Sequence, residues 1–280
     1  INWYANASGG PSLGTGSTFT TPVISTTTTY YAEAGSGCNS PRVPVEATIT
    51  SAPVAPVAAN VSRCGPGTVT LNAVGTQTIN WYSAPTGGTL LASSASYTTP
   101  SISSTTTYYV EQGTGSCQSS RVAVQAIVNS IPSAPSASDV SRCGAGSVTL
   151  TATSSTTVNW YSSSSGGTQL GTGLTFNTPS ISSTTTYYAE ANNGCASSRT
   201  AVDAIINSVP AVPSAPAVSR CGAGTVNLVA TSSEQCFWYS AASGGTLLFT
   251  GLSFTTPNIT STTTYYVETG NSCRSNRIAV

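Results

Sequence analysis

The sequence repeats itself, and this periodicity limits the folds open to the chain more than any other feature. A tryptophan followed by a tyrosine recurs at Trp3, Trp81, Trp160 and Trp238, so successive copies lie 78, 79 and 78 residues apart. Self-similarity at a fixed period indicates one structural unit per repeat, and a unit of this size is a small domain. We therefore predict a tandem array of small domains and not one large domain.

The other landmarks keep the same spacing and define the repeat. Each complete unit contains Arg-Cys-Gly-x-Gly, Trp-Tyr, Gly-Gly, Thr-Thr-Thr-Tyr-Tyr-x-Glu, a cysteine and Ser-x-Arg. The predicted organisation is a partial repeat at 1–50, complete repeats at 57–129, 136–207 and 214–280, and proline-rich linkers at 51–56, 130–135 and 208–213.

The two ends of the sequence fall inside repeats. The first unit begins at Ile1 without its opening strands, and the sequence stops at Val280 inside a last strand. Two explanations are open: the numbering cuts through a longer array, or a neighbouring chain supplies the missing strands by adding them to a sheet edge. We favour the cut, because no segment resembles a free donor strand.

The residue pattern within a unit is that of β-strands. Between Val140 and Asn207, β-branched and aromatic residues alternate with polar ones, and turns rich in Gly, Ser and Pro separate the runs. This period of two predicts short antiparallel strands and no helices. The expected inward-facing residues of this unit are Val148, Leu150, Ala152, Trp160, Tyr187, Ala189, Thr200 and Val202. We predict an all-β chain of seven-stranded sandwiches that follow one another as a linear rod.

The aromatic residues divide between the two faces of the sheet. The expected core aromatics are Trp81, Trp160, Trp238, Tyr108, Tyr187 and Tyr265. Since neighbouring residues of a strand point to opposite faces, their neighbours form a candidate surface patch of Tyr82, Tyr109, Tyr161, Tyr188, Tyr239 and Tyr266. Exposed tyrosines can stack on sugars or proteins, but we favour cross-strand packing that holds the register of the sheet.

Particular residues resemble those of an immunoglobulin domain. A Val-Thr-Leu-Thr strand precedes Trp160 and Tyr161, and a Ser-Thr-Thr-Thr-Tyr-Tyr block ends at Tyr188. The block resembles a tyrosine corner, in which Tyr187 would hydrogen-bond back to the chain near the end of its own strand. Ala152 and Ala189 occupy the places of the two core cysteines of antibody domains, so the resemblance is to bacterial Ig-like or fibronectin-III-like modules.

The complete motif series resembles the tandem Ig-like repeats of very large secreted surface proteins from Bacteroidetes-type bacteria, including gliding and attachment adhesins. The resemblance covers the whole chain. It implies an immunoglobulin-like fold, an extracellular location at the cell surface and a scaffold role as a stalk or fibre, and it leaves the ligand open.

The cysteines recur with the repeat. Cysteines near the last hairpin are Cys38, Cys117, Cys195 and Cys273, and cysteines before the second strand are Cys64, Cys143 and Cys221. Recurrent pairs in small domains indicate disulfides and an oxidising compartment, whereas no histidine and no Cys-x-x-Cys pair supports a zinc site. Cys236 stands apart from the period, beside Trp238, and we expect a free, buried thiol there.

Two disulfide patterns are open. Pairing within repeats would join Cys64 with Cys117, Cys143 with Cys195 and Cys221 with Cys273, and pairing across repeats would join Cys64 with Cys195 and Cys143 with Cys273. In a seven-stranded sandwich the loops that carry the two cysteines lie at opposite ends, some tens of ångströms apart, and a disulfide spans at most about 7 Å between Cα atoms. We therefore favour the cross-repeat pattern.

The charged residues are few, and most of them recur with the repeat. Glu33, Glu111, Glu190 and Glu268 are followed nine or ten residues later by Arg42, Arg121, Arg199 and Arg277. We expect an outer-face ion pair that contributes at most about 1 kcal/mol. The second arginine of each repeat, at Arg63, Arg142 and Arg220, is either a solvated loop charge or an interdomain contact.

Several classes of function do not fit this composition. The net charge is zero and only 6% of residues are charged, so no basic surface for a nucleic acid backbone is expected. No apolar run is long enough to span a membrane. Without lysine or histidine, and with one recurring glutamate per unit, we expect no catalytic residues, no cofactor and no metal.

The prediction is therefore a structural stalk or fibre segment of an extracellular bacterial surface adhesin, which spaces or presents a binding tip. Its expected partners are neighbouring repeats of the same chain and other copies in a fibre. Two rivals remain: a multivalent carbohydrate- or protein-binding array that uses the tyrosine patch, and the accessory region of a secreted enzyme.

Overall fold

The computed structural model describes all 280 residues and contains β-strands and no helix. The chain divides into two compact units, Ile1–Ser130 and Ile131–Val280, which are described separately. Because the structure contains no helix, it has no helix long and apolar enough to span a membrane.

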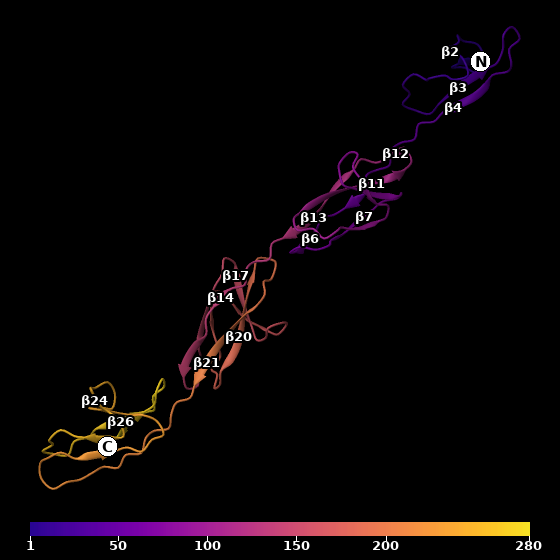
Figure 1. The fold of residues 1–280 in the computed structure, drawn as a ribbon. Helices are drawn as coiled ribbons and strands as arrows, with labels where there is room; N and C mark the ends of the chain where they lie inside the picture. The colour runs from indigo at the N-terminus through magenta and orange to yellow at the C-terminus, as the bar shows by residue number, and fades with distance from the viewer. The chain divides into compact units, whose positions relative to one another are not determined.

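The third repeat, in the second unit, consists of a three-stranded sheet and a five-stranded sheet (Figure 1). The first sheet has the order β14-β16-β19, with bounds Ser136–Ala137, Thr149–Thr153 and Thr175–Asn177. The second has the order β15-β21-β20-β17-β18, with bounds Val140–Cys143, Thr200–Asn207, Thr185–Asn192, Thr157–Tyr161 and Gln169–Thr172. The two sheets form the predicted Ig-like β-sandwich.

Alternation along the strands builds the core between these sheets. In β16, Leu150 and Ala152 are buried while the threonines between them are exposed, as a strand with one solvated face requires. Trp160 is fully buried and lies in one cluster with these residues and Val202. Thr200 departs from the expected inner face, because it is only half-buried and donates a hydrogen bond to the carbonyl of Pro135 at 2.6 Å.

The first strand of the repeat is divided, which corrects the expectation of a purely antiparallel sandwich. Its first part, β14, pairs antiparallel with β16, and its second part, β15, pairs parallel with β21 so that Cys143 lies opposite Asn207. Asp139 sits at the crossing and accepts a hydrogen bond from the backbone of Asp203 at 2.8 Å. The parallel pairing places Cys143 at the end of the last strand.

The second repeat has the same plan. Its first sheet is β10-β7-β5, with bounds Ser96–Thr98, Thr70–Val74 and Val57–Ala58. Its second sheet is β6-β13-β11-β8-β9, with bounds Val61–Cys64, Val122–Asn129, Thr106–Thr114, Ile79–Tyr82 and Leu90–Ala92, and β12 (Cys117–Gln118) pairs with the end of β11.

The first and fourth repeats have fewer strands. The first is a sheet β2-β1-β3-β4, with bounds Gly14–Thr15, Asn2–Tyr4, Thr28–Glu33 and Val43–Ala47. The fourth has a pair β22-β25, with bounds Asn227–Val229 and Ser253–Thr255, and a sheet β24-β23-β26-β27, with bounds Leu247–Thr250, Cys236–Tyr239, Tyr266–Thr269 and Ile278–Ala279.

Each core is organised around its tryptophan. In the third repeat the Trp160 ring stacks on Phe176 with 5.7 Å between centroids, and its indole N–H donates to the carbonyl of Gly173 at 2.9 Å. Tyr187 packs against Phe176 at 5.3 Å. The tyrosine-corner expectation is wrong, because the Tyr187 hydroxyl makes no hydrogen bond back to the chain and the ring acts by packing. Burial raises the pKa of Tyr187 above its usual value.

Candidate functional site

The most distinctive chemical feature of the chain is a disulfide between two repeats. Cys143, at the end of β15 in the third repeat, is bonded to Cys273 of the fourth repeat, and their Cα atoms are 5.6 Å apart. This separation is typical of disulfides. The carbonyl oxygen of Ser272 lies 3.8 Å from the Cys143 sulfur, so the two loops meet directly.

The strand arrangement explains why Cys143 has no bond within its own repeat. Cys143 lies opposite Asn207, the last residue of β21, whereas Cys195 precedes Thr200, the first residue of β21. Eight residues of strand separate these two ends by about 25 Å, well beyond the span of a disulfide. The alternative pairs Cys143 with Cys195 and Cys221 with Cys273 are therefore wrong for this structure.

The other predicted cysteine pairs have different outcomes in the structure. The within-repeat bond of Cys64 with Cys117 is also wrong, because Cys117 is unbonded and half-buried. The cross-repeat bond of Cys64 with Cys195 would join the two units of the chain and stays a prediction. Cys38 and Cys221 are unbonded and exposed.

Cys236 is an unbonded thiol in the core of the fourth repeat. It is fully buried in the cluster around Trp238. Burial raises the pKa of its thiol, and hydrogen bonds with Ser232 and Thr269 act in the opposite direction. A thiol in this setting is a small packing residue and a poor nucleophile.

The Arg-Cys loop, which we define as the Arg-Cys-Gly-x-Gly segment, is built around its own arginine. Arg142 folds back and donates a hydrogen bond to the carbonyl of Ser147 at 2.7 Å. Gly146 is required beneath it, because a Cβ at this position would collide with the guanidinium. Two backbone hydrogen bonds between Gly146 and Ile181, at 2.9 and 3.0 Å, attach the loop to the sandwich. The loop therefore presents Cys143 in a fixed position.

The same arrangement occurs in the other complete repeats, which answers the open question about these arginines. Arg63 donates to Thr68 at 2.7 Å, and Arg220 donates to Thr225 at 2.8 Å. Both bonds lie within the arginine's own loop. Arg220 is exposed, as a solvated loop charge would be, whereas Arg63 and Arg142 are half-buried, and each arginine helps to hold its cysteine-bearing loop in shape.

The recurring Glu–Arg pair forms a clamp in each repeat. In the third repeat, Arg199 donates through Nε to Glu190 at 3.0 Å and through one terminal nitrogen to the carbonyls of Ser163 and Gly166, at 2.6 and 2.7 Å. Its guanidinium also lies 3.4 Å above the ring centre of Tyr161. One side chain thus ties together the Trp-Tyr strand, the following Gly-Gly loop and the last hairpin.

The clamp is more buried than the expected outer-face ion pair. The four glutamate side chains are only 5–11% exposed, and the arginine side chains 10–14%. The pairs are Glu33 with Arg42, Glu111 with Arg121, Glu190 with Arg199 and Glu268 with Arg277. Removing one partner of a buried pair leaves an uncompensated charge and costs about 3–5 kcal/mol, and this cost measures the unpaired charge rather than the net contribution of the pair.

The candidate tyrosine patch lies beneath this clamp. The tyrosines pair directly across neighbouring strands as Tyr82 with Tyr109, Tyr161 with Tyr188 and Tyr239 with Tyr266, and all six are half-buried. The first tyrosine of each pair carries an arginine guanidinium over one ring face, at 3.4–3.5 Å. Burial and the Glu111 carboxylate raise the pKa of Tyr82, and Arg121 opposes this shift.

The predicted core aromatics lie inside the sandwiches. Trp81, Trp160 and Trp238 are fully buried, and Tyr108, Tyr187 and Tyr265 are 6–8% exposed. Sequence reasoning missed Tyr97, Phe176 and Phe254, which fill the space between each tryptophan and its core tyrosine. The sequence does carry a signal for these residues, because each complete repeat has an aromatic residue shortly before its Thr-Pro dipeptide.

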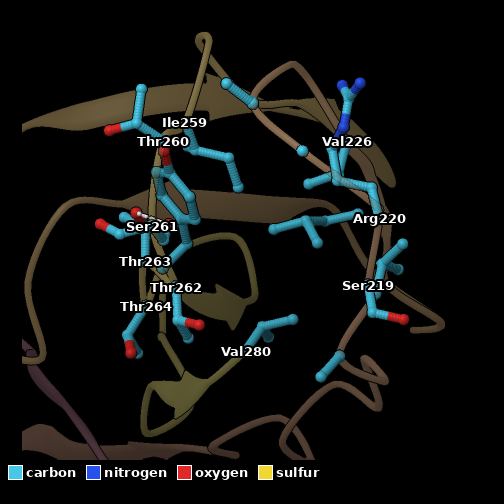
Figure 2. Close-up of a pocket in the computed structure, with 16 residues that line it drawn as sticks. Ser219, Arg220, Val226, Ile259, Thr260, Ser261, Thr262, Thr263, Thr264 and Val280 are labelled. Atoms are coloured by element: carbon cyan, nitrogen blue, oxygen red, sulfur yellow. Dashed lines mark hydrogen bonds between the residues drawn. The ribbon is translucent and has the colours of Figure 1, made fainter.

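A groove opens in the fourth repeat, with a volume of about 570 Å³. Figure 2 shows Ser219 and Arg220 on one wall and Thr262–Thr264 on the other, with Val280 between them. No titratable cluster lines the groove.

No group of three or more His, Cys, Asp or Glu side chains is placed to hold a metal ion. The recurring glutamates Glu33, Glu111, Glu190 and Glu268 are each paired with an arginine.

Comparison with known proteins agrees with this architecture. The sequence matches the family described as "Ig-like domain CHU_C associated" over residues 1–50, 53–129, 132–207 and 210–280. The chain belongs to this family of Ig-like domains. No curated protein matches it.

Solved structures similar to this Ig-like chain share little sequence with it. The fibronectin(III)-like modules of CbhA from Clostridium thermocellum are 14% identical, with a TM-score of 0.35, and the match covers 54% of this chain and 90% of that one. A set of titin domains is 13% identical, with a TM-score of 0.34, and covers 80% of this chain and 96% of its own. The tandem Ig-like repeats and the disulfide fit a structural module of an extracellular protein.

Proposed function

We propose that this chain is a segment of an extracellular stalk or fibre that spaces or presents the binding tip of a bacterial surface adhesin. The disulfide between Cys143 and Cys273 carries the proposal, because it locks one repeat to the next. A covalent bond between successive domains limits bending and resists force, which a spacer requires and an isolated binding module does not.

Contacts at the linkers support the same role. In the first unit, the Gln112 side chain donates a hydrogen bond to the carbonyl of Val54 in the linker at 2.5 Å. In the second unit, Pro210 of the linker packs close to Gly270 in the loop that carries Cys273. Proline-rich linkers that contact the next repeat act as semi-rigid spacers.

The clamp favours a structural role for the tyrosines over ligand binding. A sugar stacks on an open ring face, and a guanidinium covers one face of Tyr82, Tyr161 and Tyr239. The glutamates are held by the same arginines, so they are not disposed as a catalytic pair. We therefore place the adhesive activity outside this chain and propose that the chain itself is not catalytic.

Electron microscopy of the intact protein released from the cell surface tests the proposal. We expect a long thin fibre whose repeat is near the length of one sandwich, about 35–45 Å, and increased bending after treatment with reductant. Compact particles, or a protein found only inside the cell, would contradict the stalk.

A further inference from the structure

One edge of a sheet in the fourth repeat exposes an unusually apolar strand. β24 is the outermost strand of the sheet β24-β23-β26-β27, so it pairs on one side only (Figure 1). Three of its residues, Leu247, Leu248 and Phe249, are 37–48% exposed, and Leu252 just beyond the strand is 49% exposed. We call these four residues and the backbone of β24 the β24 edge. It offers unpaired backbone groups together with apolar side chains.

The exposure of this edge is a property of the sandwich itself. β24 and β27 are opposite edges of the sheet, so the length of β27 does not change what covers β24. The corresponding strand of the third repeat, β18, is also an edge strand. Leu170 of β18 is 39% exposed and Leu174 is 50% exposed. The fourth repeat, which follows in the same unit, therefore leaves this edge of the third repeat open.

Phe249 is not required by the core of its repeat. It lies opposite Trp238. In the third repeat Gly171 has the corresponding place, opposite Trp160, and Trp160 is fully buried without an aromatic residue there. The Phe249 ring stacks on Phe254 with 6.1 Å between centroids, so it is held in place while it remains exposed. An ordered, exposed aromatic ring that the core does not need is typical of a contact surface.

The β24 edge lacks the side chains that usually prevent edge strands from pairing. Natural edge strands are commonly protected by charged side chains or proline. No residue between 239 and 267 is charged, and β24 contains no proline. β18 is more polar at the same place, because Gln169 lies where β24 has Leu247 and its side chain donates a hydrogen bond to Thr172 at 3.0 Å. β24 is therefore the edge best suited to pair with another extended strand.

The charge distribution favours a second copy of this chain as the partner. An uncharged stretch offers no counterpart to a charged partner, whereas two identical chains of zero net charge do not repel each other. A strand can also pair antiparallel with its own copy about a two-fold axis, which would place Leu248 of one copy opposite Phe249 of the other. Apolar side chains then meet apolar side chains on both sides of the axis.

We propose that the β24 edge is the surface through which two copies of this chain associate, strand to strand and antiparallel. Stable interfaces bury about 800 Å² on each partner, which is more than four exposed side chains supply. A register shift between Trp238 and Tyr239 also keeps the strand short. We therefore expect a weak dimer, with a dissociation constant of about 10–100 µM.

Sedimentation velocity of the purified chain tests the proposal. Exposed thiols are first alkylated, so that no new disulfide can join two copies. Over a concentration range of about 1–200 µM we expect a monomer–dimer equilibrium. Native-state hydrogen exchange should slow in the peptide that covers Leu247–Thr250 as the dimer forms, and should not change in the peptide that covers Gln169–Thr172.

Two variants remove the contact in different ways. Leu248→Lys places a charge on the edge and Phe249→Ala removes the ring, and each should weaken dimerisation at least about tenfold. Leu170→Lys is the matched control, because it makes the same change at the corresponding place of β18, and it should leave dimerisation unchanged. At about 1 µM, where all chains are monomeric, wild-type hydrogen exchange in β23 and β26 would show that the variants retain their fold.

Three results would overturn the proposal. A wild-type chain that stays monomeric at every concentration would mean that the β24 edge serves a different partner or none. Dimers that survive both β24 variants would place the contact elsewhere on the chain. An equal loss in Leu170→Lys would show that any added charge prevents association. None of these results would alter the reductant-sensitive fibre expected by microscopy of the intact protein, so the two proposals can fail separately.

Discussion

At the scale of single residues, one arginine per repeat joins the last hairpin to the Trp-Tyr strand and the Gly-Gly loop. Arg277 bonds to Glu268 at 3.0 Å and to the carbonyls of Ala241 and Gly244 at 2.8 and 2.6 Å. It also covers the ring of Tyr239. A planar guanidinium can make these contacts together, whereas a lysine ammonium is a point charge that cannot reproduce them.

Replacing Arg277 by lysine should therefore destabilise the fourth repeat by about 2 kcal/mol. In native-state hydrogen exchange read by mass spectrometry, peptides from 214–280 should lose about 30-fold in protection. Arg274→Lys is the matched control, because Arg274 is exposed and lies over Phe237, a contact that lysine can keep. Equal losses in the two variants would show that the clamp contributes no more than a surface charge.

At the scale of elements, the Arg-Cys loop shows how local sequence places a thiol. Gly146 has a φ of +152° and lies against the Arg142 guanidinium. A side chain at this position must displace the arginine from Ser147, and the loop then loses the bond that shapes it. Each residue of the motif has its own role: the cysteine carries the sulfur, the arginine shapes the loop, and the glycine leaves room for the guanidinium.

Gly146→Ala should therefore reduce the yield of the Cys143–Cys273 bond several-fold during oxidative refolding, as measured by peptide mapping. Gly166→Ala provides the comparison. Gly166 also has positive φ but has open space around it, so alanine there should cost about 1 kcal/mol and leave the bond intact. Our account of the loop fails if Gly146→Ala forms the bond as well as the wild-type chain.

At the scale of the whole molecule, the disulfide limits how far the chain can extend. Cys143 and Cys273 are separated by 130 residues, and the chain between them is shielded from a force applied at the two ends. Small domains gain little stability from their own cores, so a cross-link between repeats is a direct way to resist pulling.

In single-molecule stretching of the Cys64→Ser variant by the chain ends, reductant should add about 430–470 Å to the fully extended length, at 3.3–3.6 Å for each of the 130 residues. The Cys64→Ser/Cys143→Ser double variant should show the longer length without reductant. Cys64 is included because its predicted bond to Cys195 overlaps the same stretch of chain. An extended length that does not respond to reductant would exclude a load-bearing bond.

The repeat, the all-β Ig-like class and the inward tryptophans could be predicted from the sequence, and strand length favoured the cross-repeat partner of Cys143 without excluding the within-repeat one. These features depend on period, alternation and strand length, which can be read along a chain without knowledge of its packing. Alternation placed Leu150 and Ala152 on the inner face, and both are buried.

The other features depend on how segments distant in the sequence pack together. The sequence predicted the pair of Glu190 with Arg199 but could not show that Arg199 also bonds to the Gly-Gly loop, because those contacts join residues 33 and 36 apart. The parallel pairing of β15 with β21 and the packing of Tyr187 without a corner hydrogen bond are also products of how the two sheets meet. Burial converts an apparently solvated ion pair into a clamp, since the cost of an unpaired charge rises as water is excluded.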